Sequence, residues 1–174
     1  SEKSGKGLDF VVINGDLFHD DPKFAPPVKA AFDRLPVPYY VTRGNHDHLS
    51  AEQWQQTWGY GLNHSFTFGD YGVVLLDTSD GTGKYVCSDA AWLQTELAKH
   101  AGKKGVFVFM HITPIQWTTH GIVCPDVVTL LDKTPNVLGI FHGHDHDEDG
   151  TKRSPGGKPH FWSGHFGGNW GTTY

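Results

Sequence analysis

Short apolar runs recur along the chain between longer polar stretches, and they predict strands that alternate with helices. The runs are rich in β-branched and aromatic residues, which is typical of strands buried in a parallel sheet. They comprise residues 8–13, 39–41, 66–68, 73–76, 106–110 and 137–141. Because the turn residues Gly69 and Asp70 separate the third run from the fourth, we expect these two strands to pair antiparallel. The tail, residues 161–174, is expected to hold strand and loop.

Four segments between the runs have helical character. They are residues 26–35, 51–58, 88–99 and 125–131. The helix over 88–99 is the clearest, with Ser88 as its expected N-cap and Gly102 as the left-handed residue that ends it. Strands that alternate with helices indicate an α/β fold.

The composition is that of a soluble globular protein, with 37% hydrophobic residues in a chain of 174. No internal repeat or long linker divides the sequence, so we expect one domain over residues 1–174. A net charge of −5 and the lack of a long basic run argue against a nucleic-acid partner. The apolar runs are far shorter than the roughly 20 residues that span a bilayer, and no signal-peptide pattern opens the sequence. We therefore expect a soluble protein without a membrane segment, and leave cytoplasm, export and oligomeric state open.

Two cysteines, Cys87 and Cys124, leave two alternatives open. They could form one disulfide bridge or remain two buried thiols, and their distance in the fold decides between them. The sequence contains no convincing Ser-His-Asp arrangement, Gly-rich nucleotide loop or cysteine nucleophile motif.

Residues suited to metal binding or proton transfer follow four of the predicted strands. They are Asp16, Asn45-His46, His111 and His144-Asp145-His146. Each alone has an ordinary structural reading, such as a turn residue or a buried histidine. In a parallel sheet, however, the carboxyl ends of the strands meet at one edge, so we expect these groups to converge. A carboxylate, an amide oxygen and several imidazoles suit divalent Mn, Fe or Zn better than a thiolate site or an oxygen-only calcium site.

The order of these residues resembles the signature of the calcineurin-like metallophosphoesterases. The matching blocks are Gly15-Asp16, Gly44-Asn45-His46-Asp47, His111 and Gly143-His144-Asp145-His146. The resemblance implies a four-layer α/β/β/α sandwich. It also implies a dinuclear hydrolase of small phosphoesters, in which two divalent first-row metal ions (Mn, Fe or Zn) hold the bridging hydroxide that attacks phosphorus.

The resemblance assigns the metal ligands residue by residue. Asp16 would bridge the two metals. One site would be completed by Asn45, His111 and His144, whereas the other would include His146. One block of the family signature has no match in this chain. It is an Asp-x-His at the end of an earlier strand, and residues 1–7 contain no such motif.

This absence leads to a hypothesis about the chain. We expect that it lacks its native N-terminal strand and residues at its C-terminal end as well. The second metal site then keeps only Asp16 and His146 from the signature, so this chain could bind only one ion and its own activity stays open.

The catalytic residues implied by the resemblance are His46 and Asp47. His46 would face the substrate phosphate, either as a clamp on the developing charge or as the acid that protonates the leaving oxygen, with Asp47 orienting its ring. Three further histidines are candidates for facing the substrate: His19, His48 and His165. His142 flanks the signature and is expected to be a neighbour rather than a ligand.

We expect a metal-dependent phosphoester hydrolase, with phosphodiesters or cyclic nucleotides slightly favoured over phosphomonoesters. This preference rests on residues 76–79 and the following helix, which are similar to bacterial class III cyclic-nucleotide phosphodiesterases. A minor alternative is a DNA nuclease, because residues 15–19 are similar to the nuclease subunit of double-strand-break repair complexes. The main alternative is a noncatalytic or mono-metal module that binds one ion through four residues, Asp16, Asn45, His111 and His144.

Overall fold

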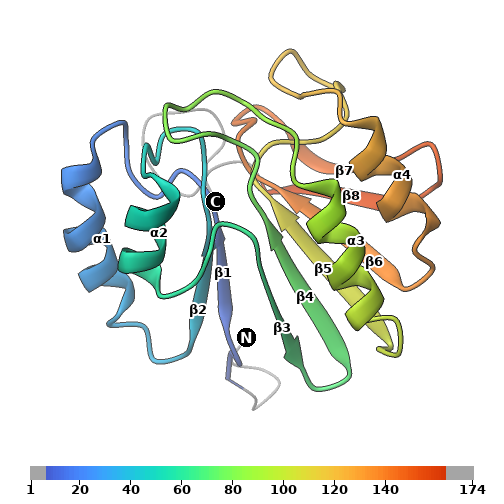
Figure 1. Cartoon of the computed structure of the whole chain (residues 1–174), viewed down its shortest axis with the longest axis horizontal. Helices are drawn as coiled ribbons and strands as arrows, with labels where there is room; N and C mark the ends of the chain where they lie inside the picture. The colour runs from blue at the N-terminus through green and yellow to red at the C-terminus, as the bar shows by residue number, and fades with distance from the viewer. Residues whose placement is uncertain (1–6, 164–174) are drawn as a thin grey trace.

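The computed structural model describes residues 7–163. Two sheets face each other, and a pair of helices covers the outer face of each sheet (Figure 1). The layers therefore follow the order α/β/β/α, and the fold class expected from the sequence is confirmed.

The small sheet consists of β1 (Val11–Asn14) and β2 (Tyr39–Thr42), which run parallel with Val11 opposite Tyr39. Its outer helices are α1 (Ala25–Phe32), which follows the short 3-10 helix η2 (Pro22–Phe24), and α2 (Ala51–Trp58). Between this sheet and its helices lies a core that includes Val41, Trp54 and Trp58, with Trp54 fully buried. The sheet thus presents its carboxyl ends, at Asn14 and Thr42, on one side of the molecule.

The large sheet has six strands in the order β3-β4-β5-β6-β8-β7. Strands β4, β5, β6 and β8 run parallel, whereas β3 and β7 run antiparallel at the two edges. The antiparallel pairing expected around Gly69 and Asp70 is confirmed as β3 against β4. The strand bounds are β3 His64–Phe68, β4 Tyr71–Leu76, β5 Gly105–Met110, β6 Val137–His142, β7 Asp149–Arg153 and β8 Pro159–Ser163.

Helices α3 (Ala90–Lys99) and α4 (Pro125–Lys133) cover the outer face of the large sheet. The core beneath them includes Leu93 and Val108, both with no exposed surface. Burial of each such side chain contributes on the order of 1.5–3 kcal/mol, so this core anchors the sheet that carries half of the strand ends discussed below.

Aromatic rings join the inner faces of the two sheets. The ring of Tyr40 from β2 stacks on Phe66 from β3 with centroids 3.8 Å apart, and Phe10 contacts Phe66 edge-on at 5.4 Å. This contact fixes the two sheets relative to each other, so residues after their strands can meet.

Two expectations about the ends of α3 were wrong. The N-cap is Asp89, whose carboxylate accepts from the Trp92 N–H, while the Ser88 hydroxyl donates to the carbonyl of Asp77. The helix ends at His100 in a conformation with negative φ, and Gly102 is not among the glycines with positive φ. Neighbouring short polar side chains compete for the same cap, and only their tertiary partners decide between them.

A disulfide bridge joins Cys87 and Cys124, whose Cα atoms lie 5.6 Å apart, and this resolves the alternative left open by the sequence. Cys87 lies in the segment between β4 and α3, and Cys124 directly precedes α4. The bridge therefore ties together two connections that start from the carboxyl ends of neighbouring strands.

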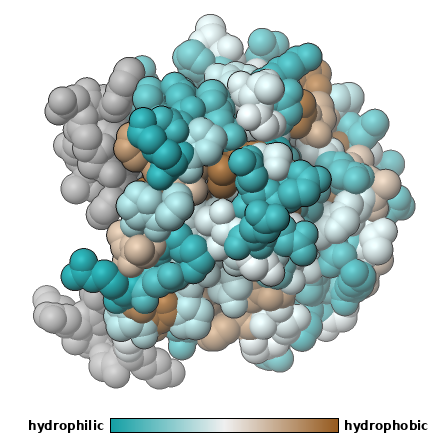
Figure 2. Space-filling view, turned by 60° about the vertical axis from the view of Figure 1, so that its left-hand side comes forward, coloured by the Kyte–Doolittle hydropathy of each residue, from teal (hydrophilic) through white to brown (hydrophobic). Residues whose placement is uncertain are grey.

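Within residues 7–163 no helix combines the length and the apolar character needed to cross a membrane. On the face seen in Figure 2, hydrophilic residues cover most of the surface, and hydrophobic residues form small separate patches. The strand expected in the tail is present as β8, and the rest of that tail lies outside the described residues.

Candidate metal centre

The two sheets bring the residues that follow four of their strands to one place. A carboxylate oxygen of Asp16, after β1, and ring nitrogens of His111, after β5, and His144, after β6, all lie within 4.8 Å of one another. Asn45, after β2, is buried close to this group, since the neighbouring His46 N–H donates to Oδ1 of Asp16 at 3.0 Å. Strand ends far apart in sequence thus assemble a set of mixed oxygen and nitrogen ligands.

Glycines make this approach sterically feasible. A Cβ atom on Gly44 would lie 2.1 Å from Oδ1 of Asp16, and one on Gly15 would lie 2.3 Å from Nδ1 of His111. Two of the candidate ligands themselves have strained backbones, with φ of 52° at Asp16 and 67° at His144. Such conformations cost about 1–3 kcal/mol each and occur preferentially at functional sites.

The carboxylate of Asp16 forms an ion pair with His111, in which Oδ2 lies 3.0 Å from Nε2. Burial favours the neutral carboxyl, but the charge and hydrogen bond of His111 and the backbone N–H of His46 outweigh it and hold the pKa of Asp16 well below its usual range. Burial likewise opposes the charged form of His111, yet Asp16 and the carbonyl of Asn14 raise its pKa. The site therefore keeps Asp16 ionised.

The orientation of His111 suits metal binding. Its Nδ1–H donates to the backbone carbonyl of Asn14 at 2.7 Å, so in the neutral ring the lone pair is on Nε2, which faces Asp16. A backbone carbonyl behind the ring is the usual support for a histidine that binds a metal.

Apart from Nε2 of His111, whose partner is the ion-paired Asp16, two buried polar atoms at the centre lack partners among residues 7–163. They are Oδ1 of Asn45 and Nε2 of His144. Leaving such atoms buried and unpaired costs about 1–3 kcal/mol each, and a metal ion would satisfy both. Burial, followed by the charge of His111, lowers the pKa of His144 to about 3, so its ring is neutral and its lone pair available. The residues therefore fit the divalent metal ions implied by the sequence.

The described residues supply fewer candidate ligands for a second metal ion than for the first. His146 is close enough to His144 for its charge to lower the pKa of that ring, but it stands outside the cluster of three that contains Asp16. A site shared by Asp16 and His146 thus remains a hypothesis.

His46 has a different partner from the one expected. Its Nδ1–H donates to Oδ1 of Asp20 at 2.7 Å. Asp47 instead accepts from three backbone N–H groups, those of Leu17 and Phe18 at Oδ1 and that of Gly44 at Oδ2. The expectation that Asp47 orients the ring of His46 was therefore wrong, because Asp47 is fully buried and faces the backbone of the loops after β1 and β2.

The buried position of Asp47 also changes its acidity. Burial, and then the negative charge of Asp16, raise its pKa to about 7 in spite of the hydrogen bonds that it accepts. Asp47 fastens together the two loops that carry Asp16 and Asn45, which is a structural contribution to the centre.

The other histidines take different positions. The exposed ring of His19 stacks on His46 with centroids 4.6 Å apart, and His48 lies 3.5 Å from Asp20. His142 is buried, with its Nδ1 bonded to the carbonyl of Met110, and it is a neighbour of the centre as expected. His165 lies outside the described residues.

Three further residues at the centre were not expected from the sequence. Asp20 binds His46, while Tyr85 and His120 contact the ring of His144 edge-on, with centroids 4.8 and 5.8 Å apart. Asp20 lies only four residues after Asp16, which was a usable signal. Tyr85 and His120 come from the two segments that the disulfide joins, and nothing in their local sequence indicated this contact.

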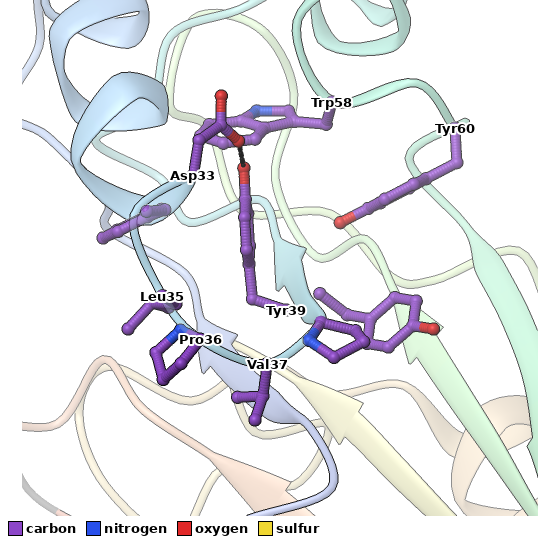
Figure 3. A pocket seen from close by; sticks show the side chains of 10 residues that line it. Asp33, Leu35, Pro36, Val37, Tyr39, Trp58 and Tyr60 are labelled. Carbon is purple, nitrogen blue, oxygen red and sulfur yellow. Dashed lines mark hydrogen bonds between the residues drawn. The ribbon is translucent and has the colours of Figure 1, made fainter.

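One hollow on the described surface lies away from these residues. It is lined by residues around Tyr39, Trp58 and Tyr60, and the hydroxyl of Tyr39 donates to Asp33 at 2.6 Å (Figure 3). Tyr39 begins β2, whereas Asn45 follows the end of that strand, so the hollow and the candidate metal ligands lie at opposite ends of the small sheet. The hollow therefore does not belong to the candidate centre.

Comparisons with known proteins agree with this geometry. The family model described as "Calcineurin-like phosphoesterase" matches residues 2–148. Among solved structures, a putative 5'-nucleotidase from Staphylococcus aureus, in complex with alpha-ketoglutarate, superimposes with a TM-score of 0.59 at 16% identity over 94% of this chain and 41% of its own. The sulfate thiohydrolase SoxB from Thermus thermophilus, in complex with glycerol, has a TM-score of 0.61 at 14% identity over 94% of this chain and 35% of its own. Among curated proteins none matches.

The chain thus spans less than half the length of both solved relatives. At these identities the likeness concerns the fold alone.

Proposed function

The chain belongs to the calcineurin-like phosphoesterase family, and from this premise we propose that it is a metal-dependent phosphoester hydrolase. The observation that carries the proposal is the convergence of Asp16, His111 and His144 beside the unpaired amide oxygen of Asn45. A structural role accounts poorly for two strained ligand backbones and two unsatisfied buried atoms in one place.

In this proposal Asp16, Asn45, His111 and His144 would hold one divalent ion. Asp16 and His146, together with ligands that residues 7–163 do not supply, would hold a second. Bound first-row metal ions supply Lewis acidity, which activates water towards phosphorus and neutralises the phosphoryl oxygens.

The protein's own residues position these groups. Asp16 stays ionised because His111 and the His46 N–H stabilise its negative charge. His111 is held through its Nδ1–H on the carbonyl of Asn14, so its ring cannot turn away from Asp16 without losing that bond. Tyr85 and His120 border the ring of His144 and limit its rotation.

We assign His46 to the substrate phosphate. Its Nδ1–H is engaged by Asp20, which leaves Nε2 as the atom that donates a proton to the leaving oxygen. Asp20 stabilises the protonated ring and fixes its direction, and is a positioning residue. Asp47 holds the backbone from which His46 projects.

We propose that phosphodiesters, including cyclic nucleotides, are better substrates than phosphomonoesters. The similarity of residues 76–79 to bacterial class III phosphodiesterases supports diesters, whereas the name of the Staphylococcus aureus relative supports a nucleotide monoester. Hydrolysis of bis-p-nitrophenyl phosphate and p-nitrophenyl phosphate with added Mn²⁺ tests both, and the variant Asp16→Asn should abolish either activity. A clear excess of monoester turnover would reverse the order.

The alternative is a noncatalytic module that binds one ion. This alternative is favoured because the second ligand set is incomplete: the described residues contribute only Asp16 and His146 to it. Elemental analysis separates the two functions: about two metal ions per chain together with turnover supports the dinuclear hydrolase. One ion with no turnover of either ester supports the module.

A further inference from the structure

A second cluster of metal-binding side chains lies at the exposed side of the centre. Ligand atoms of His19, Asp20 and His46 all lie within 4.8 Å of one another. His48 adds a third imidazole, with Nε2 3.5 Å from Oδ1 of Asp20. The ligand set proposed for the catalytic ions uses none of these four residues.

The spacing of the donor atoms is close to that of a coordination sphere. In a tetrahedral zinc site with bonds of about 2.0–2.1 Å, donor atoms are about 3.4 Å apart. His19 Nε2 lies 3.4 Å from Oδ2 of Asp20, and the separation for His48 is 3.5 Å. His46 is nearer, at 2.7 Å, because its proton forms a hydrogen bond that a metal ion would replace.

The backbone holds the cluster together independently of the side chains. The N–H of Asp20 donates to the carbonyl of His46 at 2.8 Å, which joins the loop after β1 to the loop after β2. The rings of His19 and His46 are stacked with an interplanar angle of 25°. Asp20 and His48 both have positive φ, at 59° and 30°, so each is held in a conformation that such residues rarely adopt. Little reorganisation is then needed before an ion binds.

We propose that His19, Asp20, His46 and His48 form a regulatory site for a divalent transition metal of the zinc class, separate from the catalytic ligands. Several imidazoles with a single carboxylate favour Zn²⁺, Ni²⁺ or Cu²⁺ over Mn²⁺ or Mg²⁺. The side chains of His19 and Asp20 are 70% and 48% exposed, so an ion there exchanges directly with solution.

Occupation of this site inhibits hydrolysis. When Nδ1 of His46 coordinates a metal ion it no longer carries its proton, so the ring cannot form the imidazolium that donates a proton from Nε2 to the leaving oxygen. The carboxylate of Asp20 is also withdrawn from its hydrogen bond to His46. This inhibitory effect rests on the proposed function, whereas the binding of the ion does not.

The test compares His19→Gln with Asp21→Asn, a half-buried residue on the same turn but outside the cluster. Each protein is loaded with Mn²⁺ and dialysed against a series of Zn²⁺ concentrations, and bound zinc per chain is measured. We expect one zinc equivalent to bind at least about tenfold more weakly in His19→Gln than in the wild type, with Asp21→Asn unchanged. His48→Gln should weaken the same equivalent. Circular dichroism checks that each variant is folded.

Identical zinc isotherms for the wild type, His19→Gln and His48→Gln would overturn the proposal. Activity measured in parallel separates the two hypotheses. A zinc equivalent lost in His19→Gln in a protein without esterase activity would uphold the site and refute the proposed function. An active protein inhibited equally by Zn²⁺ with and without His19 would uphold the function and refute this site.

Discussion

Oδ1 of Asp20 lies 2.7 Å from Nδ1 of His46, and this contact joins the loop after β1 to the loop after β2. It leaves Nε2 of the imidazole as the nitrogen that can serve a substrate. The contact also explains why Asp47, the next residue in sequence, does not orient the ring: its two oxygens are already occupied by backbone N–H groups.

Replacing His46 by Gln should remove the proton donor for the leaving oxygen. We expect kcat to fall about 10²–10⁴-fold for a phosphoester with a poor leaving group such as methanol, because such an alkoxide must be protonated as it departs. The loss should be smaller for p-nitrophenol, which leaves as an anion. Rates for the two esters measure the difference; an equal loss for both would show that His46 acts as a clamp only.

The variant Asp20→Asn should lower kcat by about tenfold or more while changing KM little, because it weakens the support of the His46 ring without removing the ring. Asp21→Asn is the matched control. A kcat equal to that of the wild type would contradict the positioning role.

Gly44→Ala should disrupt the centre through sterics alone. The added Cβ would lie 2.1 Å from Oδ1 of Asp16. Either the carboxylate of Asp16 or the loop must therefore move. Metal affinity is expected to fall at least about tenfold. Gly102→Ala, whose Cβ would have no heavy atom within 4 Å, is the control and should bind metal normally. Metal content after dialysis, with circular dichroism as a check on folding, measures both.

We expect the buried side chain of His160 to make the stability of the folded protein depend on pH. Burial lowers its pKa to about 4 from an ordinary value of 6.5, so the unfolded chain binds this proton first as the pH falls. The stability linked to His160 is complete above about pH 6.5 and is lost between about pH 6.5 and pH 4. Thermal unfolding at about pH 7 and about pH 5 should therefore show a smaller drop in Tm for His160→Phe than for the wild type. An equal drop would refute this assignment.

Removal of the disulfide should loosen the loops around His144. The double variant Cys87→Ser, Cys124→Ser is expected to be about 2–4 kcal/mol less stable, since the bridge closes a loop of 37 residues. Activity should fall as well, because Tyr85 and His120, which contact His144, lie in the two joined segments. Urea unfolding of the wild type with and without a reductant provides an independent measurement. No change in stability would contradict the bridge.

Much of the architecture could be predicted from local patterns. The apolar runs correspond to strands, and the turn at Gly69 and Asp70 joins an antiparallel pair as expected. The N-terminal cap of α3 could not be predicted, because Ser88 and Asp89 are both good N-cap residues. The Ser88 hydroxyl donates to the carbonyl of Asp77, which leaves Asp89 to cap the helix. Similarly, Asp20 and Asp47 are both carboxylates close to His46 in the fold, and their different burial determines which of them contacts the ring.

The sequence by itself determined the apolar strands, the alternation with helices, and the residue types at the strand ends, because these depend on periodicity and on chemistry within a few neighbouring residues. It did not indicate β7 (Asp149–Arg153), a polar edge strand without an apolar run. Only the tertiary structure decided which groups meet. The pairing of His46 with Asp20, the bridge between Cys87 and Cys124, and the contacts of Tyr85 and His120 with His144 depend on how the two sheets and their loops pack. Such contacts join residues that are distant in the chain, so no local pattern encodes them.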